Sequence, residues 1–395
     1  MQKKRVLSLL LTLAALALLM PGASALEAAD ISAGASIKRG KNDTSYRYMF
    51  DRLLDTIWTS PKSKAPFVEV TTDTPCYGVG VTFGNAALSP WTVQENVDGK
   101  WVDVASGEGL YGSEYAEIPG LTHFRIAYPR GDARYLKITE LYLFGQGDAP
   151  DTLQRWQPTV QKADLMVLAA HPDDELIWLG GMLPTYAGEK KLDTVVCYMT
   201  CKNAIRRSEL LGGLWYCGVR TYPDIGDFPD EKIMNLRGVY NLWKEDKVNA
   251  YIVALIRKYK PEVIVSHDIG GEYGHGAHRV CADALPQCVL DAADPAKFPD
   301  SAALYGVWQT KKLYLHLFKE KQITLDWDIP LASQNGLTGF ETAQNAYMLH
   351  NSQYRLGRYF VQHRDDPYSS YDFGLVYSAV GEDVQKDDLF ENIAR

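Results

Sequence analysis

One imidazole and three carboxylates follow directly after an unbroken apolar segment. Residues 164–170 have the composition of a buried strand, and the next residues are His171-Pro-Asp-Asp-Glu175. In an open α/β sheet, ligands bind beyond the carboxyl ends of the strands, so this motif lies where a catalytic loop belongs. The turn lacks the glycines with which a dinucleotide site approaches a pyrophosphate. We therefore expect metal or acid–base chemistry here, and no dinucleotide site.

A second pair of imidazoles is placed in the same way. Residues 262–266 form another apolar run, and Gly274-His-Gly-Ala-His278 lies shortly beyond its end. Parallel strands bring their C-terminal loops to one edge of a sheet, so His171 and His278 can meet although they are far apart in the chain. Imidazole nitrogen with carboxylate oxygen suits zinc, and iron, cobalt or nickel remain open by residue type. Three protein ligands and one open position form the catalytic arrangement.

The elements upstream of this site predict antiparallel β-structure. Short alternating segments rich in β-branched residues are separated by turns, and Val97-Asp-Gly-Lys100 is a hairpin signal. Strands at this spacing, without helical periodicity between them, predict an antiparallel β-sandwich over residues 26–147. The expected strands are residues 67–72, 78–84, 91–95, 101–105, 123–128 and 135–144.

The pattern changes after a turn-rich linker at residues 148–161. Downstream, over residues 162–395, apolar runs alternate with helical patterns. This alternation predicts βαβ units and an α/β fold with a parallel sheet that is covered on both faces. The order of the segment beyond Thr310 is not predicted. The expected strands are residues 164–170, 194–199 and 262–266, and the expected helices lie near residues 204–217 and 247–259.

Composition and the N-terminus limit the class of protein. The 395 residues are 46% hydrophobic and 23% charged, with a formal net charge of −8, which is a globular balance. A basic segment at residues 3–5, an apolar run at 6–20 and small residues up to Ala25 have the pattern of a signal peptide, residues 1–25, that is cleaved after Ala25. We therefore expect a secreted protein.

The composition also argues against several partners. The mature chain is acidic, so it has no electrostatic reason to bind nucleic acid or anionic lipid. No later apolar stretch reaches the roughly 20 residues that span a bilayer, so no stable membrane anchor is expected. The six cysteines contain no CxxC pair, and we expect most of them to be small buried apolar residues.

These motifs, taken together, resemble those of one enzyme family. From about residue 162 to His278 the chain resembles the PIG-L/LmbE-like metal-dependent de-N-acetylases, which remove acetyl from N-acetylglucosaminyl groups. The resemblance implies a Rossmann-like fold and a hydrolase that cleaves the amide C–N bond of an N-acetylated amino sugar or glycan. It rests on Ala170-His-Pro-Asp-Asp-Glu175, on Tyr259-Lys-Pro-Glu-Val-Ile-Val-Ser-His-Asp268 running into Gly274-His-Gly-Ala-His278, on Arg206-Arg-Ser-Glu-Leu210 opening a helix, and on Phe228-Pro-Asp230.

The resemblance implies a zinc ion held by His171, Asp174 and His278, with Asp173 as the general base. The chemistry is consistent with this assignment, because zinc lowers the pKa of bound water to about 7 and polarises a carbonyl. A carboxylate next to a ligand can take the proton of that water without itself binding the metal. Two consecutive aspartates, one binding and one acting as base, are therefore useful.

The resemblance implies further roles for His275, Arg206 and Asp230. His275 would stabilise or protonate the developing tetrahedral centre, while Arg206 and Asp230 match positions that the family uses near the sugar. The chain departs from the family at Ala277, where an Asp commonly precedes the second His. A ligating His usually has an acceptor that fixes its tautomer. That support is then missing, or another group such as Asp268 supplies it.

Each of these residues also has a plainer interpretation. The loop His and Asp side chains are compatible with a polar network or a helix cap. Asp173 could be a solvated charge and His275 an exposed loop residue. Arg206 could only form a surface ion pair with Glu209. For the Asp173 and His275 roles, and for the metal site, the order and spacing of the motifs favour the functional interpretation.

Several neighbouring residues are interpreted as structural. His267 and Asp268 at a strand end are more typical of ordinary strand termination than of support for a ligand. Trp178 and Tyr273, beside the motifs, more often pack than stack on a sugar. Three further histidines have no company that resembles a ligand set: His123, His316 and His363.

The N-terminal region resembles the discoidin-like (galactose-binding-like) β-sandwich over roughly residues 31–145. The resemblance is carried by Ile57-Trp-Thr59 and by the strand series that ends at Thr139-Glu-Leu-Tyr-Leu143. It implies a carbohydrate-binding module, although a packing role is equally compatible. Two rival functions remain: an inactive secreted carbohydrate-binding protein, and a zinc amidase with a non-sugar substrate. Asp173 argues against the first, because a binding protein has no use for a base that does not bind metal.

Overall fold

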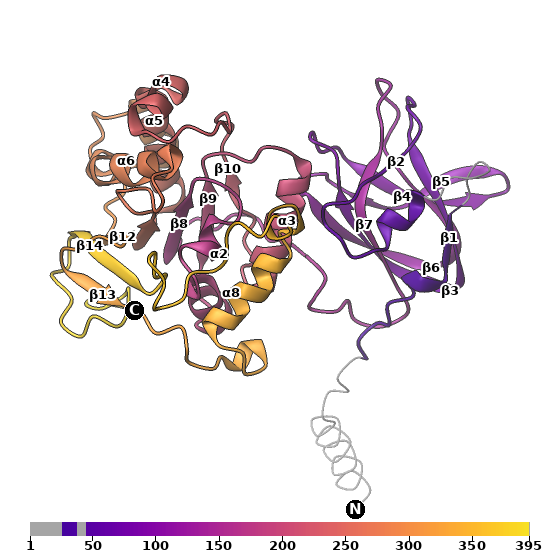
Figure 1. Ribbon diagram of the computed structural model, residues 1–395. Coiled ribbons are helices and arrows are strands. Elements are labelled where there is room, and N and C mark those ends of the chain that lie inside the picture. Colours follow the sequence, from indigo (N-terminus) through magenta and orange to yellow (C-terminus); the bar gives the residue numbers. More distant parts are fainter. Residues whose placement is uncertain (1–25, 38–44, 395) are drawn as a thin grey trace, which may run out of the picture.

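The computed structural model describes residues 26–37 and 45–394, and Figure 1 shows a β-rich body beside a mixed α/β body. We call residues 26–147 the β-domain and residues 162–394 the α/β domain. The predicted signal peptide, residues 1–25, lies outside the described residues. Within the described ranges, every helix is too short or too polar to cross a lipid bilayer.

The β-domain is built on one seven-stranded antiparallel sheet. Hydrogen bonds connect the strands in the order β2-β7-β3-β6-β4-β5, and β1 pairs with β3. Antiparallel pairing is therefore confirmed, whereas the division into two stacked sheets stays a prediction. The strands are β1 (Ala35–Ile37), β2 (Trp58–Thr59), β3 (Phe67–Phe83), β4 (Trp91–Val97), β5 (Lys100–Gly107), β6 (Ser113–Ala127) and β7 (Lys137–Phe144), with short 3-10 helices at Ser32–Gly34 and Ser45–Met49.

The predicted hairpin is confirmed, and two predicted strands prove to be one. Strands β4 and β5 meet at Asp98 and Gly99, whose φ angles of 52° and 81° are those of a tight hairpin turn. Strand β3 runs through the expected break between residues 72 and 78. Its pairing with β6 is irregular between Thr71 and Gly78, which explains the loss of alternation there. The first half of β6 was not predicted.

The α/β domain contains a second seven-stranded sheet, ordered β10-β9-β8-β11-β12-β14-β13. The first five strands are parallel, as predicted, and β14 and β13 add an antiparallel edge from the segment whose order was not predicted. The strands are β8 (Leu165–Ala169), β9 (Thr194–Tyr198), β10 (Asp224–Ile225), β11 (Val263–Ser266), β12 (Lys312–His316), β13 (Gln322–Thr324) and β14 (Asp372–Ser378).

Helices cover both faces of this sheet, as predicted. One apolar core joins the sheet to α2, α3 and α8, and the other joins it to α4, α5 and α6. The six cysteines, all within the described ranges, are free, and five of them are buried, as expected for most. The helices are α2 (Asp174–Ile177), α3 (Ala204–Tyr216), α4 (Leu236–Trp243), α5 (Glu245–Tyr259), α6 (Gly276–Ala293), α7 (Pro299–Tyr305), α8 (Gly339–Met348) and α9 (Asn351–Tyr354), with a π-helical turn at Pro184–Glu189 and a 3-10 turn at Ala332–Gln334.

The register of the parallel strands brings several loops to one edge. Leu168 of β8 is opposite both Cys197 of β9 and Ser266 of β11, and Ser266 is opposite Leu315 of β12. The loops that follow these strands therefore begin at the same level. This alignment positions the candidate site.

The two domains are joined by hydrogen bonds as well as by the linker. The guanidinium of Arg207, on α3, donates to the carbonyls of Phe83 (3.3 Å) and Ala86 (3.0 Å) in the β-domain. The amide of Gly112 donates to the hydroxyl of Tyr222 (3.2 Å). Helix α3 therefore contacts the β-domain near the end that faces the candidate site.

Candidate metal centre and active site

The loop after β8 holds Asp174 in one orientation. Its Oδ2 accepts a hydrogen bond from the backbone amide of His171 (2.7 Å), and its Oδ1 accepts one from the indole of Trp178 (3.0 Å). Asp173 precedes helix α2 with φ at 107°, a conformation that is strained for a residue other than glycine, and its side chain makes no capping hydrogen bond. The helix-cap interpretation of Asp173 is therefore wrong.

The structure brings together the three residues expected to bind metal. His171 Nδ1 lies 3.0 Å from Asp174 Oδ2, and His278 Nε2 lies 3.3 Å from Asp174 Oδ1. The rings of His171 and His278 are 5.3 Å apart between centroids. His278 is buried, and its Nε2 is without a hydrogen-bond partner among the described residues. Their identity as ligands stays a prediction.

The donor atoms around His278 suit a divalent cation. Two sets of side chains have atoms within 4.8 Å of one another: His171 with His275 and His278, and Asp174 with His267 and His278. In the second set, His267 Nε2 already accepts a hydrogen bond from the Ala170 amide (3.0 Å), so its lone pair is occupied. Imidazole nitrogen and carboxylate oxygen are typical zinc ligands. The two sets share His278, and between them they contain the three residues predicted to bind metal, His171, Asp174 and His278.

Glu272 connects the histidines below this centre. Its Oε2 accepts from His278 Nδ1 (2.6 Å), and its Oε1 accepts from His267 Nδ1 (3.2 Å) and His316 Nδ1 (3.0 Å). Burial alone would raise the pKa of Glu272, but the imidazoles of His267 and His278 hold it well below its usual value. Because the carboxylate accepts from Nδ1, the Nε2 of His278 is left to face the centre.

Three interpretations made from the sequence change here. Glu272, and not Asp268, is the acceptor that supports His278, since no hydrogen bond joins Asp268 to either histidine of the motif in the ranges that the structure describes. His267 is part of the network and does more than end a strand. His316 does have site residues around it. It closes strand β12, so the strand-end signal used for His171 was present, but the order of the tail was not predicted.

Asp173 and Arg206 form a buried ion pair. Arg206 Nη2 lies 3.0 Å from Asp173 Oδ2, the same guanidinium donates to the carbonyl of Pro172, and Nη1 pairs with Glu209 (3.2 Å). Arg206 is only 8% exposed, so the surface-pair interpretation is wrong although the contact with Glu209 exists. Burial raises the pKa of Asp173 to about 6, against the opposing effect of Arg206.

His275 and Asp230 both lie next to His171. The His275 ring centroid is 4.8 Å from that of His171 and 4.7 Å from that of His278. Burial, with the neighbouring imidazoles, lowers the pKa of His275 to about 3, so its ring is neutral. Its Nδ1 has no hydrogen-bond partner in the described part of the chain. Asp230 Oδ1 is 3.8 Å from His171 Nε2.

A cavity of about 260 Å³, which we call the catalytic pocket, opens over these groups. Trp178 is buried and holds Asp174, so packing is its main role, whereas Tyr273 is half-buried and its ring, 5.6 Å from that of Trp178, borders the pocket. Residues outside the motifs described above complete the wall: Lys202, Lys232, Gln353, Arg358 and Tyr359.

Comparison with known proteins shows that part of the α/β domain is similar to one enzyme family. Residues 166–289 match the family model described as PIG-L, GlcNAc-PI de-N-acetylase. A 189-residue segment is 28% identical to a 1D-myo-inositol 2-acetamido-2-deoxy-alpha-D-glucopyranoside deacetylase of Rhodococcus erythropolis, covering 40% of this chain and 61% of that protein. The match thus spans about three fifths of that curated relative. These matches support the PIG-L deacetylase family, and a hydrolase of that type, for this segment.

Solved structures show weaker similarity. An N,N'-diacetylchitobiose deacetylase from Pyrococcus horikoshii aligns with a TM-score of 0.37 and 17% identity, covering 48% of this chain and 71% of that one. A family 32 CBM from C. perfringens in complex with galactose aligns with a TM-score of 0.24 and 14% identity, covering 30% of this chain and 99% of that one. At these scores neither match adds to the fold described above.

Proposed function

We propose that the protein is a secreted zinc-dependent hydrolase that removes the N-acetyl group from an N-acetylglucosamine-type sugar or glycoconjugate. The observation that carries the proposal is the buried Nε2 of His278, which makes no hydrogen bond within the described ranges and faces Asp174 and His171, while Asp173 lies beside them. A metal-binding set next to a non-ligating carboxylate is what hydrolysis of an amide by activated water requires.

Each residue then has a defined task. His171, Asp174 and His278 would hold the ion, which when bound lowers the pKa of water and polarises the acetyl carbonyl. Asp173 accepts the proton from that water, and Arg206, 3.0 Å away, fixes the direction of its carboxylate. The neutral ring of His275 offers an N–H to the developing oxyanion.

The substrate is tested by acetate release. Purified protein is analysed for metal and incubated with N-acetylglucosaminides and, in parallel, with a panel of simple N-acyl amines. We expect stoichiometric zinc and acetate release from the sugars. Metal binding with turnover only of the simple amines would instead identify an amidase, and metal-free protein that binds glycans without turnover would identify a carbohydrate-binding protein.

Secretion is the part of this proposal that rests on residues 3–25 alone. The basic, apolar and small-residue pattern supports export with cleavage after Ala25. N-terminal sequencing of protein recovered from the medium should begin at Leu26. Recovery of the uncleaved chain only inside the cell would contradict it.

A further inference from the structure

A second cavity, of about 370 Å³, lies where the two domains meet and shares a wall with the catalytic pocket. We call it the interdomain groove. Lys202, in the segment between β9 and α3, lines both cavities. The β-domain contributes Ala86, and the α/β domain contributes the remaining wall: Cys201, Lys202, Asn203, Ala204, Arg207, Tyr222, Pro223 and Ile225.

The walls of the interdomain groove combine an aromatic ring with a few polar groups. The half-buried ring of Tyr222 is fixed, since its hydroxyl accepts the Gly112 amide (3.2 Å) and its centroid is 4.8 Å from that of Tyr111. Apolar surface comes from Ile225, and an exposed ammonium comes from Lys202. Small-molecule sites of roughly 300–1,000 Å³ have this mixture of apolar walls and few polar groups. A sugar ring, with an apolar face and hydroxyls at its edge, matches it.

The groove is held in a fixed position relative to the catalytic carboxylate. Two consecutive residues at the start of α3 point in different directions, one to the catalytic pocket and the other to the β-domain. Arg206 pairs with Asp173 in the catalytic pocket, and Arg207 donates to the carbonyls of Phe83 and Ala86 in the β-domain. The β-domain wall is therefore tied to the catalytic base through one helical turn. A ligand entering the groove would lose little free energy to reorganisation.

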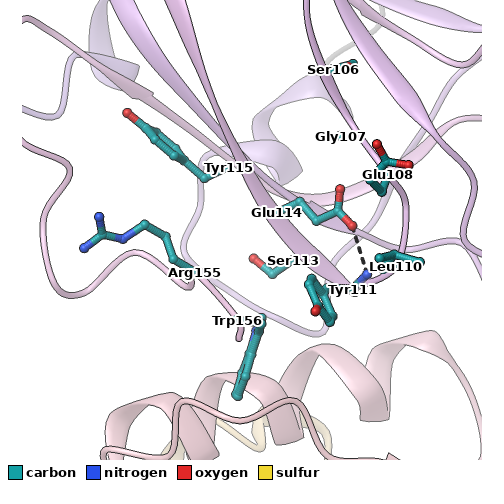
Figure 2. A pocket seen from close by; sticks show the side chains of 10 residues that line it. All are labelled: Ser106, Gly107, Glu108, Leu110, Tyr111, Ser113, Glu114, Tyr115, Arg155 and Trp156. Atoms are coloured by element: carbon teal, nitrogen blue, oxygen red, sulfur yellow. Dashed lines mark hydrogen bonds between the residues drawn. The ribbon is translucent and has the colours of Figure 1, made fainter. Parts of the chain in front are cut away.

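A separate cleft is lined by aromatic rings that lie next to Tyr222 of the groove. Its volume is about 360 Å³, and Figure 2 shows Tyr111 and Trp156 in it, between the strands of the β-domain and the helices below, with Tyr115 and Arg155 to one side. The ring of Tyr222 is 5.7 Å from that of Trp156. The rings of Tyr111 and Trp156, which line the cleft, and the ring of Tyr222, which lines the groove, therefore form one aromatic cluster.

We propose that the interdomain groove binds the sugar residue adjacent to the one that loses its acetyl group, so that the substrate is a glycan chain and not a single N-acetyl sugar. This proposal rests on the deacetylase function proposed above. Three observations support it: Lys202 lines both cavities, the ring of Tyr222 is fixed, and Arg207 donates a hydrogen bond to the β-domain. The β-domain would then act as part of the substrate-binding surface.

The first test measures the dependence on chain length. Acetate release is followed for full-length, zinc-loaded protein with β-1,4-linked N-acetylglucosamine oligomers of one to four sugars. We expect kcat/KM to rise at least about tenfold from one sugar to two or three, mainly through KM, because one added ring contributes aromatic and polar contacts. Equal kcat/KM for all lengths would overturn the proposal.

A blocking variant locates the effect. Ala86 is exposed on the β-domain side, so Ala86→Trp would fill the groove from outside the α/β domain. We expect the ratio of kcat/KM for the trimer to that for the monomer to fall to about one. Ala87→Trp is the matched control, because Ala87 is exposed and adjacent but does not line the groove. A ratio in Ala86→Trp equal to that in the control would overturn the proposal.

A binding measurement separates this inference from the deacetylase function. Titration of the trimer into the zinc-loaded Asp173→Asn protein keeps turnover slow during the measurement, and the same titration is made with Ala86→Trp or Ala87→Trp added. We expect Kd to rise at least about tenfold with Ala86→Trp only. If the wild type releases no acetate but this rise occurs, the deacetylase function is wrong and the groove is supported. An unchanged Kd overturns the groove whatever the activity.

Discussion

The two domains bury different kinds of side chain. The core of the β-domain is made of apolar and aromatic side chains such as Trp58, Phe83 and Trp91, and Glu140 is its buried carboxylate with an ion-pair partner, Arg52. The carboxyl edge of the α/β sheet instead collects buried charged and polar groups: Asp173, Asp174, Glu175, Arg206, Glu209, His267, Glu272, His275, His278 and His316. Burying ionisable groups is costly unless they are paired, so their concentration at one edge marks a site built for function.

Two buried glutamates make the contrast concrete. In the β-domain, burial raises the pKa of Glu140 to about 8, because Arg52 compensates only in part. In the α/β domain, the imidazoles around Glu272 outweigh the same effect of burial and hold its pKa well below the usual value. The first carboxyl is destabilised as an anion and the second is stabilised as one. The difference lies in the neighbours, and it predicts different responses to the same kind of substitution.

The largest effect is expected from His278→Ala. This change removes a buried imidazole that faces Asp174 and leaves the remaining groups too few to hold the ion. Zinc content should fall to background, and acetate release should fall with it, while the fold persists. The measurement is elemental analysis beside the activity assay. His123→Ala, on the exposed surface of the β-domain, should keep both; stoichiometric zinc in His278→Ala would contradict the ligand assignment.

Asp173→Asn should lose activity without losing metal. The amide keeps the size of the side chain but cannot accept the proton, so kcat should fall by ~10²–10⁴-fold while zinc stays stoichiometric. Asp98→Asn, in the hairpin turn of the β-domain, is a control for the chemical change. Zinc lost together with activity in Asp173→Asn would mean that the two aspartates share the ligand role.

The same residue sets the expected pH dependence. Because burial raises the pKa of Asp173 to about 6, the carboxylate is protonated below that pH and cannot act as base. The kcat of the wild type should therefore fall as the pH drops through about 6. The residual activity of Asp173→Asn should lack this acidic limb. An identical limb in both proteins would assign the titration to another group.

Glu272→Gln should weaken metal binding without abolishing it. Glutamine keeps the shape but removes the negative charge that three imidazoles share, so the tautomer of His278 is no longer fixed. Loss of such a supporting acceptor typically raises the metal Kd by about 10–100-fold. Competition with a chromogenic chelator measures it, and the exposed Glu320→Gln is the control. Unchanged zinc affinity would show that Glu272 only fills space.

The parts predicted from the sequence are those with a local signal. His171 and His278 each follow an apolar run that forms a parallel strand, and the register of β8 and β11 brings their loops to one edge. Glu272 had no such signal, because it lies in a loop between His267 and His278, and its third partner, His316, joins it only when β12 is placed beside β11. The break expected inside β3 has a similar cause, since pairing with β6, and not local alternation, keeps that strand extended.

The smallest expected effect concerns stability and leaves activity unchanged. In the β-domain the folded state keeps a proton on Glu140 up to about pH 8, whereas the unfolded chain releases it near the ordinary value of 4.5. The folded state therefore binds more protons in this window, so the contribution of Glu140 to stability falls as pH rises from about 5 to 8.

Glu140→Gln removes that dependence while half-exposed Arg52 remains solvated. Relative to the wild type, the variant should gain on the order of 1–3 kcal/mol of unfolding free energy between pH 5 and 8. Urea unfolding at both pH values measures this. Parallel curves for the two proteins would show that Arg52 compensates the buried anion fully, and the contrast with Glu272 would then be one of degree.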